Sequence, residues 1–429
     1  MATIDRLPGV YYEEGMTYDV DGVGSKIPVF IGVTGNRKID KVVDETTGNV
    51  TTEEYLIDGT VFLTYDKSDK ILNKSIKDGG ILNISAENPT DEQIQTAKDA
   101  NQLYKTIEEF YEESRLINSG DIGVPHIYVI DVGDGKSPTA WKNAYKTAKK
   151  LLDVQIEVYD GAVIKKSGNA TNFYMTNKES PDLTFAEYIE LILRTDTEYS
   201  IETCAKNLDL RTVFTTVHGE DDKNVDADLI KCIKSLQHTY SRLGLIEPYL
   251  FGKHIARICC TPANTEPGYY TYRSVNPGTF IERTKADMLN LQNNGIIFGR
   301  DEHINGKVYP KMNLCVSTSF KPSNRPADSL FHARFNADSL LNDVFEACYS
   351  QVKANESATN IAYLQVRINK LVNDRISAEE MVKWNDKTER GTKLTVSETD
   401  EDPYALVVSG YILPVKSTIA IKVNSTIQL

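Results

Sequence analysis

The chain has 429 residues, a length that predicts two or three domains because a single hydrophobic core rarely serves so long a polypeptide. Its 40% hydrophobic and 25% charged residues are ordinary values for a globular protein. The formal net charge of -13 argues against a nucleic-acid partner, and no apolar run is long enough to cross a bilayer, so we expect no membrane insertion by this chain.

The first 25 residues are predicted to form an extended N-terminal arm. A proline-glycine turn is followed by a short extended run before any domain begins. The first six residues lack the basic and apolar layout of a signal peptide, so we expect the chain to fold in a cytoplasm. The arm residues that we expect to pair with another chain are Pro8, Gly9, Val10, Tyr11 and Tyr12.

An α/β domain is predicted over residues 26–270, where strands and helices alternate and favour a partly parallel sheet. Within it, the polar residues 37–119 are predicted to form a surface-facing insertion that includes a helix from Asp91 to Tyr111. The predicted strands are Ile27–Val33, His126–Ile130, Val154–Tyr159 and Thr212–Val217. The other predicted helices are Ser137–Leu152, Leu183–Leu193 and Asp226–Leu243.

An α+β domain is predicted over residues 271–415, where strands flank helices without strict alternation. Asn305-Gly306 is a typical two-residue hairpin turn. The predicted helices are Lys285–Asn293, Asp338–Val352 and an amphipathic one that includes Ile361, Leu364, Ile368 and Leu371. The predicted strands are Gly295–Phe298, Val308–Phe320, Thr392–Val396 and Tyr404–Leu413.

The last residues, 416–429, are predicted to form a C-terminal strand arm. From Ile419 the sequence alternates between apolar and polar residues up to the last position, which is the period of a half-buried strand. A long strand with open backbone groups favours pairing with another chain. The alternative, that this strand closes the chain's own sheet, stays open. The apolar residues are Ile419, Ile421, Val423, Ile427 and Leu429.

Motifs for catalysis or metal binding are weak. Val132–Ser137 follows a strand and opens a helix, but a phosphate-binding loop needs a glycine where Ile130 stands. The loop His218–Asp222 joins a histidine to three carboxylates at the end of a strand, so an enzyme or metal-binding protein that uses this loop is the alternative function. The six cysteines form no CxxC pair, so neither a disulfide framework nor a zinc site is expected. Since no motif fits a known cofactor or metal site, we expect neither in the leading interpretation.

Four segments resemble the tail sheath proteins of contractile phage tails and related contractile injection systems. They are the opening Pro8–Glu14, the apolar strand and turn Ile27–Gly35, the segment Gly252–Asn264, and Gly410–Val415 with the alternating strand after it. The order of arm, α/β middle and α+β C-terminal domain is similar too. The stretch Val308–Phe320 departs from the family, because it lacks the tryptophan-glycine-alanine-arginine sequence common in phage sheaths.

The resemblance implies a structural subunit without enzymatic activity. Its partners would be other copies of itself in stacked rings, the inner tail tube, and the baseplate and tail terminator proteins. Its place would be the tail of a virion or the sheath of an injection particle, assembled in a host bacterial cytoplasm. The sheath would contract to drive the tube through a target envelope.

The resemblance also implies which residues carry assembly. Neighbouring subunits would exchange their terminal arms by strand addition. The sheet receiving the arms would include Leu406, Val408, Tyr411 and Leu413. Basic residues available for an acidic tube are Arg367, Lys370 and Arg375, although a solvated helix face also explains them. Another self-assembling protein, such as a tail tube or capsid component, is a rival that the α/β middle disfavours.

Overall fold

The computed structural model describes about three fifths of the chain at the level of individual residues. The residues described are 26–34, 38–43, 50–55, 61–64, 70–74, 80–82, 84, 86, 88–117, 126–132, 138–151, 154–160, 164–166, 173–175, 183–184, 211–216, 242–262, 265–320, 329–349, 351, 358–398 and 406–415. The chain divides into two compact units, one of which contains Tyr11–Pro262 with Pro267–Asn324, and the other Met1–Val10, Ala263–Glu266 and Arg325–Leu429.

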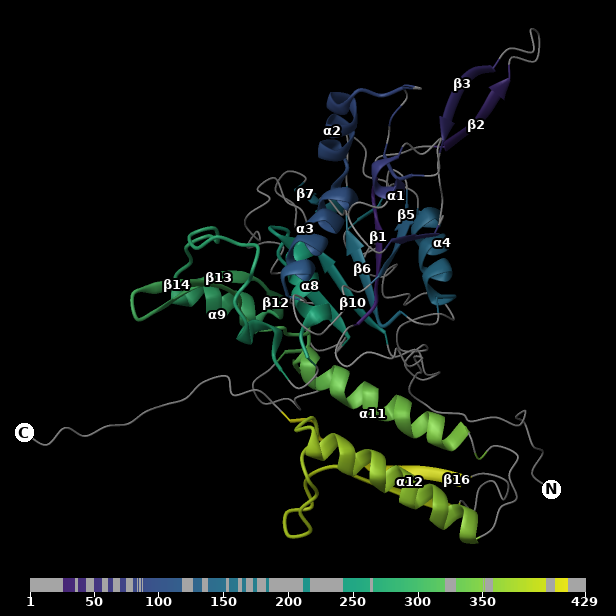
Figure 1. Cartoon of the computed structure of the whole chain (residues 1–429), viewed down its shortest axis with the longest axis vertical. Helices are drawn as coiled ribbons and strands as arrows, with labels where there is room; N and C mark the ends of the chain where they lie inside the picture. The colour runs from purple at the N-terminus through teal and green to yellow at the C-terminus, as the bar shows by residue number, and fades with distance from the viewer. Residues whose placement is uncertain are drawn as a thin grey trace, which may run out of the picture. The chain divides into compact units, whose positions relative to one another are not determined.

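A seven-stranded sheet forms the centre of the first unit, which we call the α/β unit (Figure 1). Neighbouring strands are parallel except for β4, which is antiparallel to β5. In spatial order the strands are β12 (Ile296–Ile297), β11 (Leu243–Ile246), β10 (Thr212–Thr216), β6 (Ile156–Asp160), β1 (Pro28–Gly32), β5 (Ile127–Asp131) and β4 (Val61–Thr64).

Helices cover both faces of this sheet, as its apolar strands require. Every residue of β1 and β6 is buried, which is typical of parallel strands between two layers. Phe30 of β1 contacts Phe110 of α3 (Gln102–Ile117), and Tyr159 of β6 contacts Trp141 of α4 (Pro138–Lys149). Because Phe30 is in register with Val158, Phe30 and Tyr159 point to opposite faces, so α3 and α4 lie on opposite sides.

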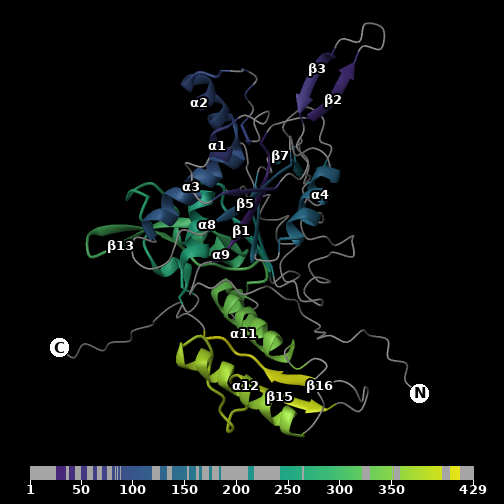
Figure 2. The ribbon, with the colours of Figure 1, turned by 45° about the vertical axis from the view of Figure 1, so that its right-hand side comes forward.

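The predicted surface insertion at 37–119 is wrong for two of its parts. Strand β4 is a member of the central sheet, and α3 packs tightly on α8 (Phe251–Cys260), in which every residue is buried. Figure 2 shows α3 and α8 side by side. The many polar residues of this segment suggested a surface position, but α3 also carries a continuous apolar face that packs in the core. Its buried hydrophobic residues are Leu103, Tyr104, Ile107, Phe110 and Tyr111.

Smaller elements complete the α/β unit. The turn expected at Asn305-Gly306 is confirmed, since both residues have positive φ angles, 50° and 75°, between β13 and β14. The predicted helix at Leu183–Leu193 is wrong at its first residues, which form a strand. The elements are β2 (Lys38–Val43), β3 (Val50–Tyr55), α1 (Lys70–Asn73), α2 (Asp91–Ala100), β7 (Ile164–Lys166), β8 (Phe173–Met175), β9 (Leu183–Thr184), η2 (Pro267–Tyr269), α9 (Lys285–Asn293), β13 (Gly299–Ile304) and β14 (Lys307–Met312).

The second unit, which we call the hairpin unit, contains two long helices and one antiparallel hairpin. The helices are α11 (Phe331–Tyr349) and α12 (Ala358–Ser377), and the strands are β15 (Lys393–Glu398) and β16 (Leu406–Tyr411). Its core joins one face of each element. The buried residues are Leu340, Val344, Ala347, Leu364, Ile368, Val372, Met381, Leu394 and Val396.

The boundary expected at residue 271 differs from the division in the structure. Residues Pro267–Asn324 belong to the α/β unit. The physical reason is that β12 extends the central sheet by pairing with β11, and that β14 pairs with β13 and ends at Met312 rather than continuing to Phe320. Most of the helix expected at Asp226–Leu243 lies outside the described residues, but Leu243 itself begins β11. Among the helices that the structure describes, none combines the length and the apolar character needed to span a membrane.

Candidate assembly site at the β15–β16 hairpin

The hairpin has one inward and one outward face. Leu394 and Val396 are buried, and their partners on β16, Gly410 and Val408, lie on the same inward face. On the outward face, Thr395 is in register with Ser409, and both are exposed. The alternation of buried and exposed residues along β15 is what a sheet with one covered face requires.

The cover on the inward face is incomplete at β16. Leu406, Val408 and Ile412 pack against the core of the hairpin unit but remain partly exposed, whereas Leu394 and Val396 are buried. Helix α12 packs against β15. Helix α12 therefore covers β15 more fully than β16, and the apolar side chains of β16 are only half covered.

An aromatic stack stands at the far end of the hairpin. Trp384 and Tyr411 are parallel within 16° at a centroid separation of 5.7 Å, and the Lys393 ammonium lies 5.4 Å from the centre of the Trp384 ring. Tyr411 is 67% exposed. Neither the stack nor its members Trp384 and Lys393 were found from the sequence, because the three residues meet only when the hairpin has formed.

The loop before β15 is tied to the end of β16. Thr392 uses its hydroxyl as an acceptor for the Leu413 amide at 3.0 Å, and the Val382 amide donates to the Leu413 carbonyl at 2.9 Å. The Thr392 amide in turn donates to the Val382 carbonyl at 2.9 Å. These bonds hold the main chain at the start of β15 and the end of β16 in one arrangement.

The residues expected to receive the arms therefore have different positions. Leu406 and Val408 lie on the inward face of β16, Tyr411 lies on its outward face, and Leu413 follows the strand with both main-chain groups bonded. The two arms themselves, Pro8–Glu14 and Thr418–Leu429, lie outside the described residues, so their pairing stays a prediction.

The three basic residues expected to contact a tube differ in how exposed they are and in whether they are bonded within the chain. Lys370 is exposed on α12 and Arg367 is half-buried. Arg375 donates to Asp343 at 2.6 Å and to Glu380 at 2.7 Å, and also bonds Ser339. Burial lowers the pKa of Arg375, but the hydrogen bonds and charges of Asp343 and Glu380 outweigh it and raise the pKa. Arg375 therefore links α11 to the end of α12 within its own unit.

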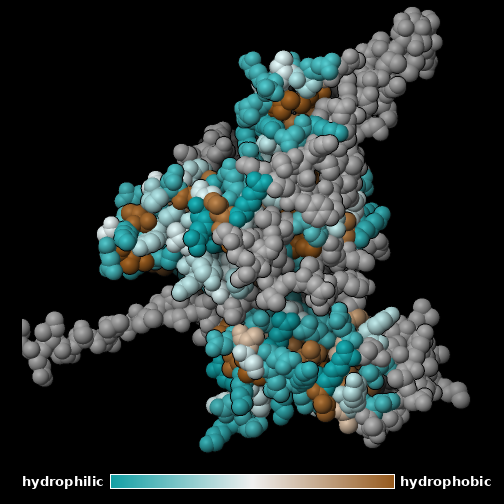
Figure 3. Space-filling model, in the orientation of Figure 1, coloured by the Kyte–Doolittle hydropathy of each residue, from teal (hydrophilic) through white to brown (hydrophobic). Residues whose placement is uncertain are grey.

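The surface of the hairpin unit is mostly hydrophilic, with small apolar areas between charged residues (Figure 3). Two of its exposed apolar side chains, Tyr363 and Val366, lie three residues apart on α12, and Lys370 follows four residues later on the same side of the helix. This stripe faces away from the core residues Leu364 and Ile368.

The carboxyl edge of the central sheet, where α/β enzymes commonly bind ligands, is closed where the structure describes it. Asp131 accepts the Thr34 hydroxyl with both oxygens, at 2.7 and 2.8 Å. Asp160 accepts the Thr106 hydroxyl from α3. Both aspartates are fully buried. The alternative site His218–Asp222 lies outside the described residues, and no cluster suited to a metal ion occurs within the described ranges.

Two buried carboxylates, Glu113 and Glu247, link segments of the α/β unit that are distant in sequence. Glu113 of α3 accepts hydrogen bonds from Arg257 of α8 and from the amides of Arg273 and Ser274. Glu247 pairs with Arg283 at 2.6 Å and accepts the Gly299 amide. Each carboxylate has an oppositely charged partner and backbone donors, so these residues have a structural role.

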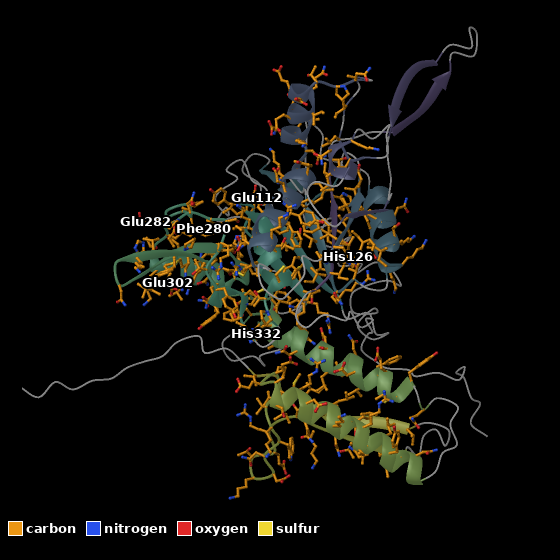
Figure 4. The ribbon with its side chains drawn as sticks, in the orientation of Figure 1. Glu112, His126, Phe280, Glu282, Glu302 and His332 are labelled. Atoms are coloured by element: carbon orange, nitrogen blue, oxygen red, sulfur yellow. The ribbon has the colours of Figure 1, made fainter. Side chains whose placement is uncertain are left out.

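Two buried histidines contact other side chains of the protein. His254 is buried, and its ring packs on Tyr272 and Phe280, the latter labelled in Figure 4. His332, at the start of α11 in Figure 4, has its Nδ1 atom 3.0 Å from the Glu266 carboxylate. Three of the described cysteines, Cys259, Cys260 and Cys315, are buried, and Cys348 is half-buried.

Comparison with known proteins gives no match at the level of sequence families. No family model matches the chain, and no curated protein does. Solved structures do match over the whole length. The sheath of an extracellular contractile injection system, PVC, in its contracted state, is 11% identical with a TM-score of 0.60, covering 99% of this chain and 98% of that one.

Two further structures come from the anti-feeding prophage. Its helical sheath in the contracted state is 10% identical with a TM-score of 0.55, and each chain is covered to 99%. A chain of its six-fold symmetrised baseplate is 10% identical with a TM-score of 0.52, covering 99% of this chain and 100% of that one. This chain therefore has the fold of the sheath proteins of contractile injection systems.

Proposed function

We propose that this chain is the structural subunit of a contractile sheath, which polymerises around an inner tube and contracts to drive that tube through a target envelope. The observation that carries the proposal is the likeness of fold over 99% of the chain to contractile sheath proteins. A fold does not determine function by itself, so the proposal also draws on the exposed hairpin described above.

The hairpin supports the proposed way of assembly. A two-stranded sheet with half-covered apolar side chains on β16 is suited to gain a strand from another copy. The alternating C-terminal arm supplies apolar side chains on one face only, at Ile419, Ile421 and Val423. Backbone pairing of this kind would keep subunits connected while the sheath changes length.

Contraction needs no bound nucleotide in this proposal. If each subunit buries ~400 Å² more apolar surface in the contracted state, the gain is about 10 kcal/mol per subunit. Summed over many subunits, this free energy suffices for mechanical work. The exposed Lys370 and half-buried Arg367 on α12 remain proposed contacts with an acidic tube, whereas Arg375 is engaged by Asp343 and Glu380.

The enzymatic alternative has less support. It would use the loop His218–Asp222, which lies outside the described residues, whereas the described aspartates at the carboxyl edge, Asp131 and Asp160, are already bonded to threonines. Replacing Asp221 and Asp222 by asparagine tests it. A sheath subunit should assemble unchanged, while an enzyme or metal site should lose ligand binding.

Electron microscopy of the purified full-length chain in negative stain tests the proposed function. We expect hollow, striated cylinders. Deleting Thr418–Leu429 should leave a folded monomer, measured by circular dichroism and by light scattering after size exclusion. Cylinders formed by the truncated chain would contradict the role of the arm.

A matched pair of arm variants separates the two faces of the predicted strand. Ile421→Ser with Val423→Ser removes apolar side chains, and Lys422→Ser with Asn424→Ser changes only the polar face. The first pair should lose polymerisation, because burial of these side chains drives strand addition. The second should polymerise as the parent chain does.

A further inference from the structure

The two edges of the β15–β16 hairpin are not equivalent. In an antiparallel pair, the main-chain groups of alternate residues point toward the partner strand and those of the residues between them point away. On β15 the outward-pointing groups are identified by a side chain that binds them. Gln365 of α12 accepts the Val396 amide at 2.7 Å and donates to the Leu394 carbonyl at 3.0 Å.

Gln365 thus makes the two hydrogen bonds that an added strand would make at the centre of β15. Its side-chain amide is oriented by a third bond, from Nε2 to the Asn369 Oδ1 atom at 2.8 Å one helical turn later. Gln365 is flanked on α12 by the core residues Leu364 and Ile368, which fix the helix against the sheet. An incoming strand at this edge would have to displace a bonded, partly buried side chain.

The other edge of the hairpin follows from the same alternation. The main-chain N–H and C=O groups of Leu394 and Val396 point away from β16. The main-chain groups of their register partners, Gly410 and Val408, therefore point away from β15. Leu406 and Ile412 are two residues away from these positions, so their main-chain groups also point away from β15. Within the described part of the chain, no strand other than β15 pairs with β16. The side chains of Leu406, Val408 and Ile412 on this edge are also those left half covered.

We propose that Gln365 closes one edge of the hairpin, so that the C-terminal arm of a second copy, residues 419–429, is added at the β16 edge alone. This inference rests on the proposed function and specifies its acceptor. The apolar face of the arm covers Leu406, Val408 and Ile412, and its polar face, which includes Lys422, Asn424 and Thr426, lies beside Ser409. Gln365 acts as a positioning residue, because it decides where the strand adds without contacting it.

Interchain disulfide formation in the full-length chain tests this proposal. Ser409 and Thr395 are a matched pair, exposed on the same face and in register on the two strands. Each is replaced by cysteine in combination with a cysteine at Lys422, Asn424 or Thr426. A strand added at β16 lies about 5 Å from that strand but about 10 Å from β15, and the second spacing is too long for a disulfide.

We expect a ladder of cross-linked chains on a non-reducing gel for at least one Ser409→Cys combination. The Thr395→Cys combinations should give at least tenfold less cross-linked product under the same oxidant. Arm variants without the hairpin cysteine measure the background from the native thiols. Equal cross-linking at Thr395 and Ser409 would overturn the single-edge proposal while leaving strand addition intact.

Substitution Gln365→Leu should raise cross-linking at Thr395 at least tenfold, because the Leu394 and Val396 main-chain groups become available. Asn369→Ala, which removes only the orienting bond, should give a smaller increase. An unchanged Thr395 product in Gln365→Leu chains that retain their circular dichroism spectrum would show that Gln365 is not the reason for the choice. Cross-links at neither strand would contradict both this inference and strand addition in the proposed function.

Discussion

The α/β unit and the hairpin unit bury their strands in opposite ways. Strands β1 and β6 are buried at every residue between helices on both faces. Strand β15 alternates between buried and exposed residues, and β16 has no fully buried residue. A sheet covered on both faces is complete within its own chain, whereas a half-covered hairpin leaves apolar area and backbone groups for a partner.

One ion pair from each unit shows a similar contrast in burial. Arg257 and Glu113 are 3% and 0% exposed, while Arg375 and Asp343 are each 24% exposed. A buried pair cannot lose one member without leaving an uncompensated charge, but a partly solvated pair can. Removing one member of the Arg257–Glu113 pair should therefore cost more stability than removing one member of the Arg375–Asp343 pair.

The largest expected effect is at the contact between α3 and α8. A Cβ atom at Gly252 would lie 2.0 Å from the Thr106 carbonyl oxygen, and backbone atoms on both helices would have to move apart. Gly252→Ala should lower the free energy of unfolding by more than about 3 kcal/mol. Urea unfolding followed by tryptophan fluorescence measures this.

Gly278→Ala provides the control for that substitution. Gly278 has a φ of +83° with no atom within 4 Å of the added carbon, so only conformational strain is introduced. Its cost should be about 1 kcal/mol. If both substitutions cost the same, the close packing of α3 on α8 is not what makes Gly252 necessary.

Removing one member of an ion pair in each unit tests the comparison directly. Glu113→Gln leaves Arg257 with a buried, unbalanced charge and should cost about 3 kcal/mol in unfolding free energy. Asp343→Asn should cost less than about 1 kcal/mol, because Arg375 keeps Glu380 and is partly solvated. Similar losses in the two variants, measured by urea unfolding at pH 7, would remove the distinction between the units.

Glu109 predicts a pH dependence that belongs to the α/β unit alone. Burial raises the pKa of Glu109 from 4.5 to about 7, although the Gly252 amide and Lys253 oppose the change. Between these pH values the folded protein keeps a proton that the unfolded chain releases, so stability falls as the pH rises toward 7. Glu109→Gln should remove this dependence and add on the order of 3 kcal/mol at pH 8.

Urea unfolding at pH 5 and pH 8 measures the difference, with Glu92→Gln on the exposed face of α2 as the control. The control should follow the parent chain at both pH values. A gain from Glu109→Gln that is equal at pH 5 and pH 8 would argue against a raised pKa at this site.

The smallest expected effect on stability is at the exposed end of the hairpin. Tyr411→Ala removes the stack on Trp384 and should lower the free energy of unfolding by about 1 kcal/mol or less. Tyr411→Phe keeps the stack and should match the parent chain. A loss above about 3 kcal/mol would mean that the hairpin is more deeply involved in the core than its 67% exposed tyrosine indicates.

Much of the fold was predictable from local pattern. The apolar run before Gly32, the Asn305-Gly306 turn and the periodic apolar residues of α12 each follow from short-range periodicity or turn chemistry. The predicted hairpin strands also match β15 and β16 to within a few residues. The prediction of a surface insertion at 37–119 was wrong for α3, because the sequence of its apolar face does not show which part of the protein will cover it.

Sequence by itself therefore determined where most of the described strands and helices lie and which of their faces are apolar, because these depend on residues two to four positions apart. It was wrong at Leu183–Thr184, which form a strand, and beyond Met312, where β14 ends. Only the tertiary structure decided that α3 lies beneath α8, that Glu113 meets Arg257, and that Gln365 binds the edge of a strand 29 residues later in the chain. Nothing in the local sequence marks a glutamine on an amphipathic helix as an edge-binding group. Its role exists only once the helix and the strand are packed together.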